Sequence, residues 1–121
     1  MRKDGVNTMF TGITERVEEL IEKDKMHRKD TERESLFFLI AGNDELWKLQ
    51  DRIYDFEDHS IKPEVLESGI CTSSKTLIRV GFNLYNSYPT ESILDCFYAL
   101  DDDNFELVIQ AIRIRLNKVK E

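Results

Sequence analysis

The chain has few cysteines and no long apolar run, and each shortage excludes a class of protein. Its two cysteines, Cys71 and Cys96, are far apart, with no CxxC spacing and no histidine at metal-ligand spacing. This pattern indicates reduced thiols, not a disulfide framework or a zinc site. Runs of roughly eighteen apolar residues are absent, so we expect neither secretion nor membrane spanning. We therefore expect a cytoplasmic protein without a cofactor or bound metal.

The common catalytic motifs are also absent. The sequence contains no GxGxxG, GxxxxGK[ST], GxSxG or HExxH. The run Asp101-Asp102-Asp103 resembles the start of a calcium loop, but Glu106 stands where such a loop requires glycine. A capped turn between two helices explains the run better. We therefore predict that the chain is not an enzyme.

The composition is that of a folded, helix-rich chain. Its 121 residues are 40% hydrophobic and 34% charged, with only two prolines and five glycines, which is typical of a single globular domain. Apolar residues recur at helical spacing, and no segment alternates for long enough to be a convincing strand. We predict an all-α, compact single-domain bundle of six to seven short helices, with a flexible arm over 1–10 and the domain over 11–121.

The bundle is expected to form around residues 31–41, TERESLFFLIA. Its first residue, Thr31, is followed three positions later by Glu34, which is a capping-box pattern. The segment 36–41 leaves no polar side for water, so it predicts a buried central helix. Gly42 is expected to end that helix in the left-handed conformation, and Asn43 to cap the next one.

Three further predictions concern the second half of the chain. Thr72-Ser73-Ser74 offers three candidate helix caps, and Gly81 inside the following helix predicts the close approach of another helix. Asp103 with Glu106 predicts a capping box for the last helix. The helix before it is expected to bury five apolar residues: Ile93, Leu94, Phe97, Tyr98 and Leu100.

The charge is acidic and unevenly distributed. A formal net charge of -7 argues against binding to nucleic-acid phosphates as the main activity. The candidate interaction face consists of acidic residues in the middle of the chain: Asp44, Glu45, Asp51, Asp55, Glu57 and Asp58. Such a face can bind a basic groove on another protein, although solubility alone is the commoner explanation.

A second candidate site combines a helix start with a charged turn. The start carries Ser73, Ser74, Lys75 and, one turn later, Arg79, which together could hold an anion. The turn carries Asp30, Glu32 and Arg33 at the beginning of the central helix. Helix capping and a structural ion pair explain the same residues more simply. If they form a ligand pocket, the two stretches must meet in one concave site.

Several ordered motifs carry a family resemblance over most of the chain. They are Asp30-Thr31-Glu32-Arg33 leading into Leu36 to Asp44, Ile53-Tyr54-Asp55-Phe56, Ser73-Ser74-Lys75, Asn83-Leu84-Tyr85-Asn86, and Leu100 to Leu107 with Ala111-Ile112. In these the sequence resembles a domain-of-unknown-function family of Clostridia, Bacilli and their prophages. The resemblance implies a bacterial or phage cytoplasmic protein. It transfers no catalytic residue, substrate or cofactor.

Three functional hypotheses follow. The leading one is a small non-enzymatic module that binds another protein with a basic surface, in its sharper form an inhibitor of a host defence protein. The second is a small-molecule or nucleotide binder, or enzyme, that uses the Ser-Ser-Lys helix start. The third is a homo-oligomeric structural protein that associates through Trp47, Tyr54 and Phe56. These three aromatic residues are more than the buried stripe of one helix requires, so they could form an association surface.

Overall fold

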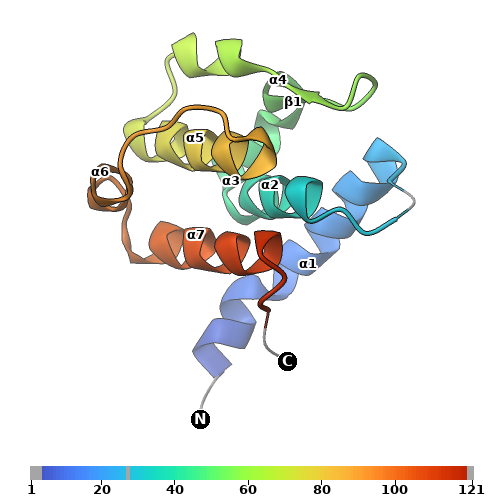
Figure 1. Cartoon of the computed structure of the whole chain (residues 1–121). Coiled ribbons are helices and arrows are strands. Elements are labelled where there is room, and N and C mark those ends of the chain that lie inside the picture. The colour runs from blue at the N-terminus through green and yellow to red at the C-terminus, as the bar shows by residue number, and fades with distance from the viewer. Residues whose placement is uncertain (1–3, 27, 120–121) are drawn as a thin grey trace.

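Helix α2, Thr31–Gly42, lies at the centre of the molecule and is covered on several sides. The computed structural model describes residues 4–26 and 28–119, and side chains from residue 12 onward. Within these ranges it contains seven α-helices, a 3-10 helix and two short strands. Figure 1 shows α2 between α5, Thr72–Asn86, and α7, Asp102–Arg115, with α1, Asp4–Asp24, crossing beside them. The predicted all-α bundle around a buried central helix is confirmed.

The sequence of α2 explains why it occupies this place. Residues 35–41 are all buried, so the helix has no face that can remain in water. Only Ser35 among them has a polar side chain, and its hydroxyl donates to the carbonyl of Glu32 at 3.0 Å. The helix begins at Asp30, whose carboxylate accepts the backbone N–H of Arg33 at 3.1 Å. The cap is therefore Asp30 and not Thr31 as predicted.

Gly42 ends α2 without the left-handed conformation that the sequence suggested, because no glycine has a positive φ among the described residues. Its role is close packing. A Cβ atom at this position would lie 2.5 Å from Leu107 Cδ2 and 3.2 Å from Ile13 Cδ1. Gly81 serves the same purpose in α5, since a Cβ there would lie 2.8 Å from Leu36 Cδ1. The predicted close approach at Gly81 is confirmed.

Asn43 caps α3, Asp44–Lys48, by accepting the N–H of Leu46 at 3.0 Å, as predicted. The chain then forms α4, Gln50–Ile53, and a hairpin that the sequence did not predict. Its strands β1, Tyr54–Asp55, and β2, Ser60–Ile61, are antiparallel, with Tyr54 opposite Ile61. The strands are too short for an alternating pattern to show. A 3-10 helix, Pro63–Glu67, leads on to α5.

Two further helix starts differ from the sequence-based predictions. Helix α5 begins after Cys71 with no side-chain cap, so the hydroxyls of residues 72–74 do not cap it. Helix α7 is capped by Asp101, which accepts the N–H of Asn104 at 2.9 Å, and not by Asp103. Adjacent Asp or Ser residues can cap a helix equally well. The residue at which the helix begins is therefore decided by packing further along it.

Helix α1 covers most of the stretch for which a flexible arm was predicted. It begins at Asp4, whereas the apolar periodicity starts near Ile13. No proline interrupts residues 4–12, so the helix can continue beyond its apolar stripe. Residues 1–3 lie outside the described part of the chain.

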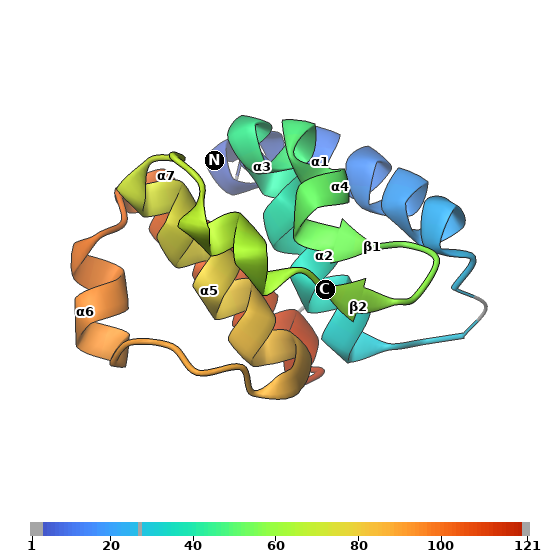
Figure 2. The ribbon, with the colours of Figure 1, turned by 90° about the horizontal axis from the view of Figure 1, so that it is seen from above.

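Helix α6, Ile93–Tyr98, is the main departure from the predicted core. Figures 1 and 2 show it at the edge of the molecule, away from α2. Only Cys96 in it is buried. Ile93, Leu94 and Tyr98 are 74%, 64% and 81% exposed, so the prediction that they are buried is wrong. Six residues form fewer than two turns, and the adjoining segments place the buried side at Cys96.

Gly42→Ala is expected to lower the free energy of unfolding by about 1–2 kcal/mol. The added methyl group overpacks the contact with Leu107 and Ile13, and this cost exceeds the roughly 1 kcal/mol gained in helix propensity. Gly12→Ala is the control, because nothing lies within 4 Å of its Cβ position. It should leave stability unchanged or raise it. Urea unfolding followed by circular dichroism measures both, and equal effects would contradict the packing role of Gly42.

Candidate functional site

The six predicted interaction acids are largely engaged within the chain. Asp44 pairs with Arg16 at 3.0 Å, and Asp51 pairs with Lys23 at 2.7 Å. Glu45 accepts the hydroxyl of Ser74 at 2.6 Å, a hydrogen bond that lowers the pKa of its carboxyl group. This face therefore carries less free negative charge than the sequence implies.

Asp55 is also used internally. Its Oδ1 accepts the backbone N–H groups of Glu57 and Asp58, both at 2.9 Å, and these bonds lower the pKa of the Asp55 carboxyl group. Glu57 and Asp58 are exposed on the same turn, and within the described residues their carboxylates form no ion pair. Two of the six acids thus remain available to a partner.

The second predicted site is not assembled. Ser74 contacts Glu45 near the C-terminal end of α2, whereas Asp30 and Arg33 lie at its N-terminal end. A helix of 12 residues separates the two groups by roughly 18 Å. The two groups therefore do not meet in the single concave site that this hypothesis requires.

The remaining members of that site have separate surroundings. Arg79 Nη1 lies 3.4 Å from Glu91 Oε2, beside a shallow hollow formed with Pro89 and Thr90. Glu32 lies 3.5 Å from Arg115 on α7. Ser73 and Lys75 are partly exposed at the first turn of α5. These contacts bind elements of the fold together.

A buried ionic cluster lies where α1, α2 and the hairpin meet. Asp24 is fully buried, and its carboxylate accepts Arg33 Nη1 at 2.8 Å and faces His59 Nδ1 at 2.8 Å. Arg33 also lies 3.3 Å from Asp30. The predicted carboxylate partner of Arg33 is thus Asp30 together with Asp24. Nothing in the local sequence marks Asp24 as buried, so the sequence alone did not single it out.

Two tyrosines, Tyr85 and Tyr54, lie beside this cluster. The Tyr85 hydroxyl donates to the backbone carbonyl of His59 at 2.7 Å, and His59 itself has a positive φ of 58°. Tyr54 is fully buried, its ring 5.9 Å from that of Tyr85, and burial raises the pKa of its phenol. Because Tyr54 is buried, the proposed aromatic association surface of Trp47, Tyr54 and Phe56 does not exist in that form.

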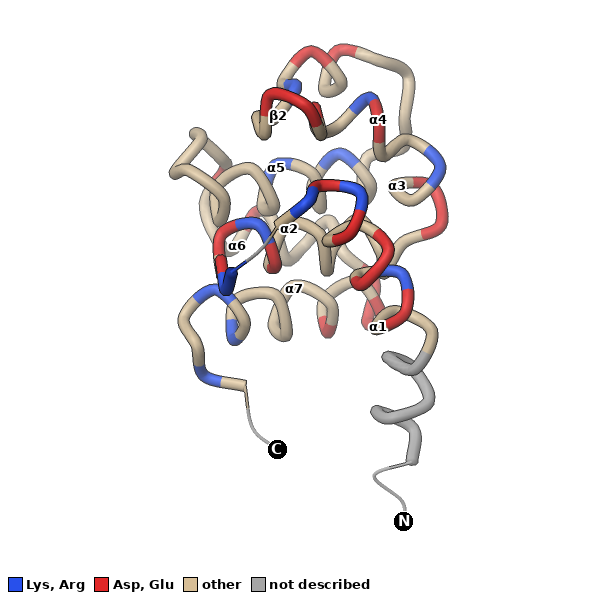
Figure 3. Tube along the Cα trace, turned by 90° about the vertical axis from the view of Figure 1, so that its right-hand side faces the viewer, with Lys and Arg blue, Asp and Glu red and all other residues tan. Residues whose placement is uncertain are grey.

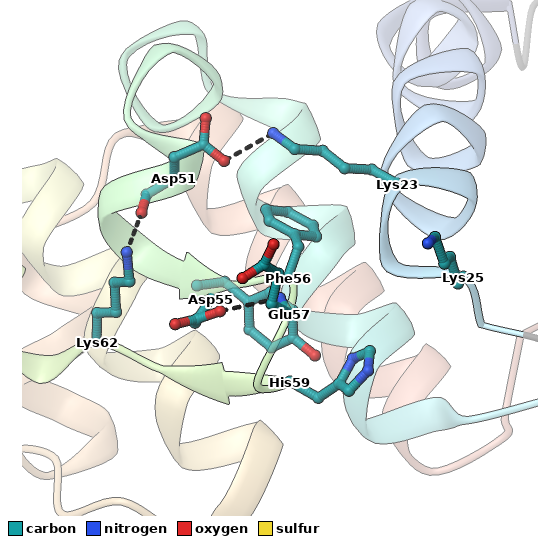
Figure 4. Close-up of a pocket in the computed structure, with 9 residues that line it drawn as sticks. Lys23, Lys25, Asp51, Asp55, Phe56, Glu57, His59 and Lys62 are labelled. Atoms are coloured by element: carbon teal, nitrogen blue, oxygen red, sulfur yellow. Dashed lines mark hydrogen bonds and ion pairs between the residues drawn. The ribbon is translucent and has the colours of Figure 1, made fainter.

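A hollow with a volume of about 680 Å³ lies beside this hairpin. Figure 4 shows Lys23 and Lys25 on one side and Lys62 on the other, with Asp51, Asp55 and Glu57 between them. Lys23 lies over the Phe56 ring at 4.5 Å, and Lys62 donates to the Asp51 carbonyl at 2.7 Å. Three lysines and three acids balance one another, so the hollow favours neither anions nor cations.

An apolar surface surrounds α6. A hollow of about 390 Å³ lies between α6 and the start of α7, lined by Leu94, Phe97, Tyr98, Leu100, Asp102 and Phe105. Two of the lining residues, Phe97 and Phe105, meet edge to face with their ring centroids 4.9 Å apart. We call this set, together with Ile93, the α6 surface. Besides Asp102, three exposed acids adjoin it: Asp95, Asp101 and Asp103.

Neither a metal-binding cluster nor a helix that could cross a membrane is found among the described residues. No group of three or more His, Cys, Asp and Glu side chains is placed to hold a metal ion there. In the same residues, no helix has both the length and the apolar character that crossing a membrane requires.

Comparison with known proteins places the chain in a family. A family model described as "Family of unknown function (DUF6075)" matches residues 9–121. The predicted resemblance to a family of unknown function is thereby confirmed. No match was found among curated proteins or among solved structures.

Asp24→Asn should lower the free energy of unfolding by about 2–3 kcal/mol, because Arg33 and His59 lose the charge of a buried partner. This loss of stability is at the lower end of what breaking a buried ion pair usually costs, because Arg33 and His59 are both partly exposed. Asp51→Asn, which breaks the exposed pair with Lys23, should cost less than about 1 kcal/mol. Thermal and urea unfolding of the two variants compares them. Similar losses would show that Asp24 is no more important than a surface acid.

Cys71 should react with iodoacetamide well before Cys96. Its thiol is exposed, and hydrogen bonding to Ser74 and Ser73 lowers its pKa, so more thiolate is present at neutral pH. Cys96 is buried. Ser74→Ala should slow the labelling of Cys71, and mass spectrometry of the modified peptides measures both rates. Labelling of Cys96 first would contradict the exposure of the two thiols.

Proposed function

The chain belongs to this family of unknown function, and we propose that it is a non-enzymatic module that binds another protein through the α6 surface. The observation that supports this is the exposure of Ile93, Leu94 and Tyr98, three large apolar side chains within one six-residue helix. Isolated apolar residues are common on protein surfaces. A contiguous patch beside an apolar hollow is typical of an interaction site.

The hollow at this surface suits a partner's side chain. Phe97, Leu100 and Phe105 line it, while Leu94 and Tyr98 stand at its edge and are exposed. Aromatic side chains around a pocket are characteristic of the centre of an interface, where a few anchors supply most of the binding energy. An apolar anchor inserted here would remove both its own surface and that of Leu94 and Tyr98 from water.

The charge around the α6 surface indicates the kind of partner. Asp95, Asp102 and Asp103 are exposed, and among the described residues they form no ion pairs. Acids around an apolar centre favour a partner that has basic residues around an apolar anchor, and they increase the association rate at low salt. The acidic interaction face is therefore proposed at these residues, with Glu57 and Asp58 outside it. An inhibitor of a host defence protein remains one form of this function.

Affinity capture of the tagged chain from a lysate of its source organism tests the proposal. Leu94→Ser combined with Tyr98→Ser should abolish recovery of a captured partner, with little effect on stability because both side chains are exposed. Leu116→Ser is the matched control, since Leu116, which directly follows α7, is 56% exposed and lies outside this surface. It should leave capture unchanged.

A second set of variants separates charge from apolar contact. Asp95→Asn with Asp103→Asn should weaken capture at low salt and have little effect at high salt, because salt screens exposed charges. Recovery that is unaffected by the substitutions at Leu94 and Tyr98 would contradict the proposed surface.

A further inference from the structure

A second groove lies between α1 and the end of α7, away from α6. This groove has a volume of about 390 Å³, and its apolar lining consists of Val17, Ile21, Phe38, Ile114 and Val119. Phe38 is nearly buried, whereas Val119 is 48% exposed, so the groove has a covered floor and an open side. The ion pair of Lys29 and Glu34, at 3.5 Å, lies at its border.

A row of glutamates continues this groove along α1. The hollow next to it, of about 600 Å³, is lined by Ile21 together with Glu15, Glu18, Glu19 and Glu22. Ile21 borders both hollows, so the apolar floor and the acidic row adjoin. We call the combined feature the α1/α7 groove. Figure 3 shows acidic positions along the described part of α1.

The four glutamates form one row on the surface of α1. They recur at the i, i+3, i+4 and i+7 spacing of one helix face and are all exposed. Within the described residues, none of them forms an ion pair or a side-chain hydrogen bond. By contrast, Asp24, Asp44 and Asp51 all have cationic partners.

This arrangement is destabilising for the isolated helix. Like charges three and four residues apart repel one another along α1. The basic residues at the same spacing from Glu19, which are Arg16 and Lys23, pair with Asp44 and Asp51 instead. Cations brought by a partner would relieve the repulsion and meet four carboxylates at once. Solubility alone does not require the acids to border an apolar groove.

We propose that the α1/α7 groove binds a basic amphipathic helix of a partner protein. Apolar side chains of that helix would contact Ile21, Val17 and Val119, while its Lys or Arg residues would lie along the glutamate row. The row from Glu15 to Glu22 extends for about 10 Å, so it matches roughly two turns of a bound helix. A helix that binds in a groove in this way is recognised by its apolar side chains at positions i, i+3 or i+4, and i+7.

The groove is separate from the α6 surface, and the two do not depend on one another. No residue lines both, and α6 lies at the far edge of the molecule from the end of α1 (Figure 2). One partner could contact both surfaces, or each could bind its own. An experiment must therefore measure binding to the groove in a variant whose α6 surface no longer binds a partner.

A displayed library of helical peptides, selected on the chain carrying Leu94→Ser and Tyr98→Ser, tests the groove alone. We expect enriched peptides to have an apolar face flanked by Lys or Arg. Their affinity should fall about tenfold in Glu18→Gln with Glu22→Gln, because two of the four carboxylates are removed. Val119→Asn should also weaken binding, and it is safe for folding because that side chain is half exposed.

The control is Glu64→Gln with Glu67→Gln, which makes the same change in net charge at two exposed acids outside the groove. This control should leave peptide affinity within about twofold of the parent. When the peptide is added to the parent, the amide chemical shifts of α1 and of the end of α7 should change. The proposal is overturned by no enrichment, by enriched peptides without basic residues, or by equal losses in the control and groove variants. Circular dichroism establishes that each variant is folded.

Discussion

The burial of α2 on every side is the constraint on which the rest of the structure depends. A helix whose residues 35–41 are all buried cannot lie at a surface, so α1, α3, α5 and α7 must cover it. Such close packing leaves room for only small residues at the tightest contacts, which is why Gly42 faces Leu107 and Gly81 faces Leu36. The order of helices around α2 then fixes which polar groups meet.

The polar contacts follow from that arrangement. Covering the start of α2 with the end of α1 buries Asp24, and a buried carboxylate requires partners, which Arg33 and His59 supply. The hairpin is thereby attached to α1, because His59 at its turn contacts Asp24, and to α5, because Tyr85 donates to the His59 carbonyl. The hollow of about 680 Å³ lies on this same hairpin, yet its charges are balanced by the pairing of Lys23 with Asp51.

The features that remain unpaired lie outside the packed centre. Helix α6 buries only Cys96 and presents apolar side chains to solvent, while α1 presents a glutamate row beside an apolar groove. Neither the exposed face of α6 nor the glutamate row of α1 is needed to cover α2. Both therefore support a function in binding proteins, in which the acidic net charge selects partners with basic residues.

The sequence alone determined the helical class, the buried central helix and the close approach at Gly81, because apolar periodicity and glycine inside a helix act locally. It also indicated that Arg33 needs a carboxylate. Only the tertiary structure decided that Asp24 supplies it, that Glu45 and Asp51 are engaged by residues distant in sequence, and that Ile93, Leu94 and Tyr98 face solvent. An apolar residue has the same local pattern whether a neighbouring helix covers it or not. Pairing and exposure depend on which helices meet.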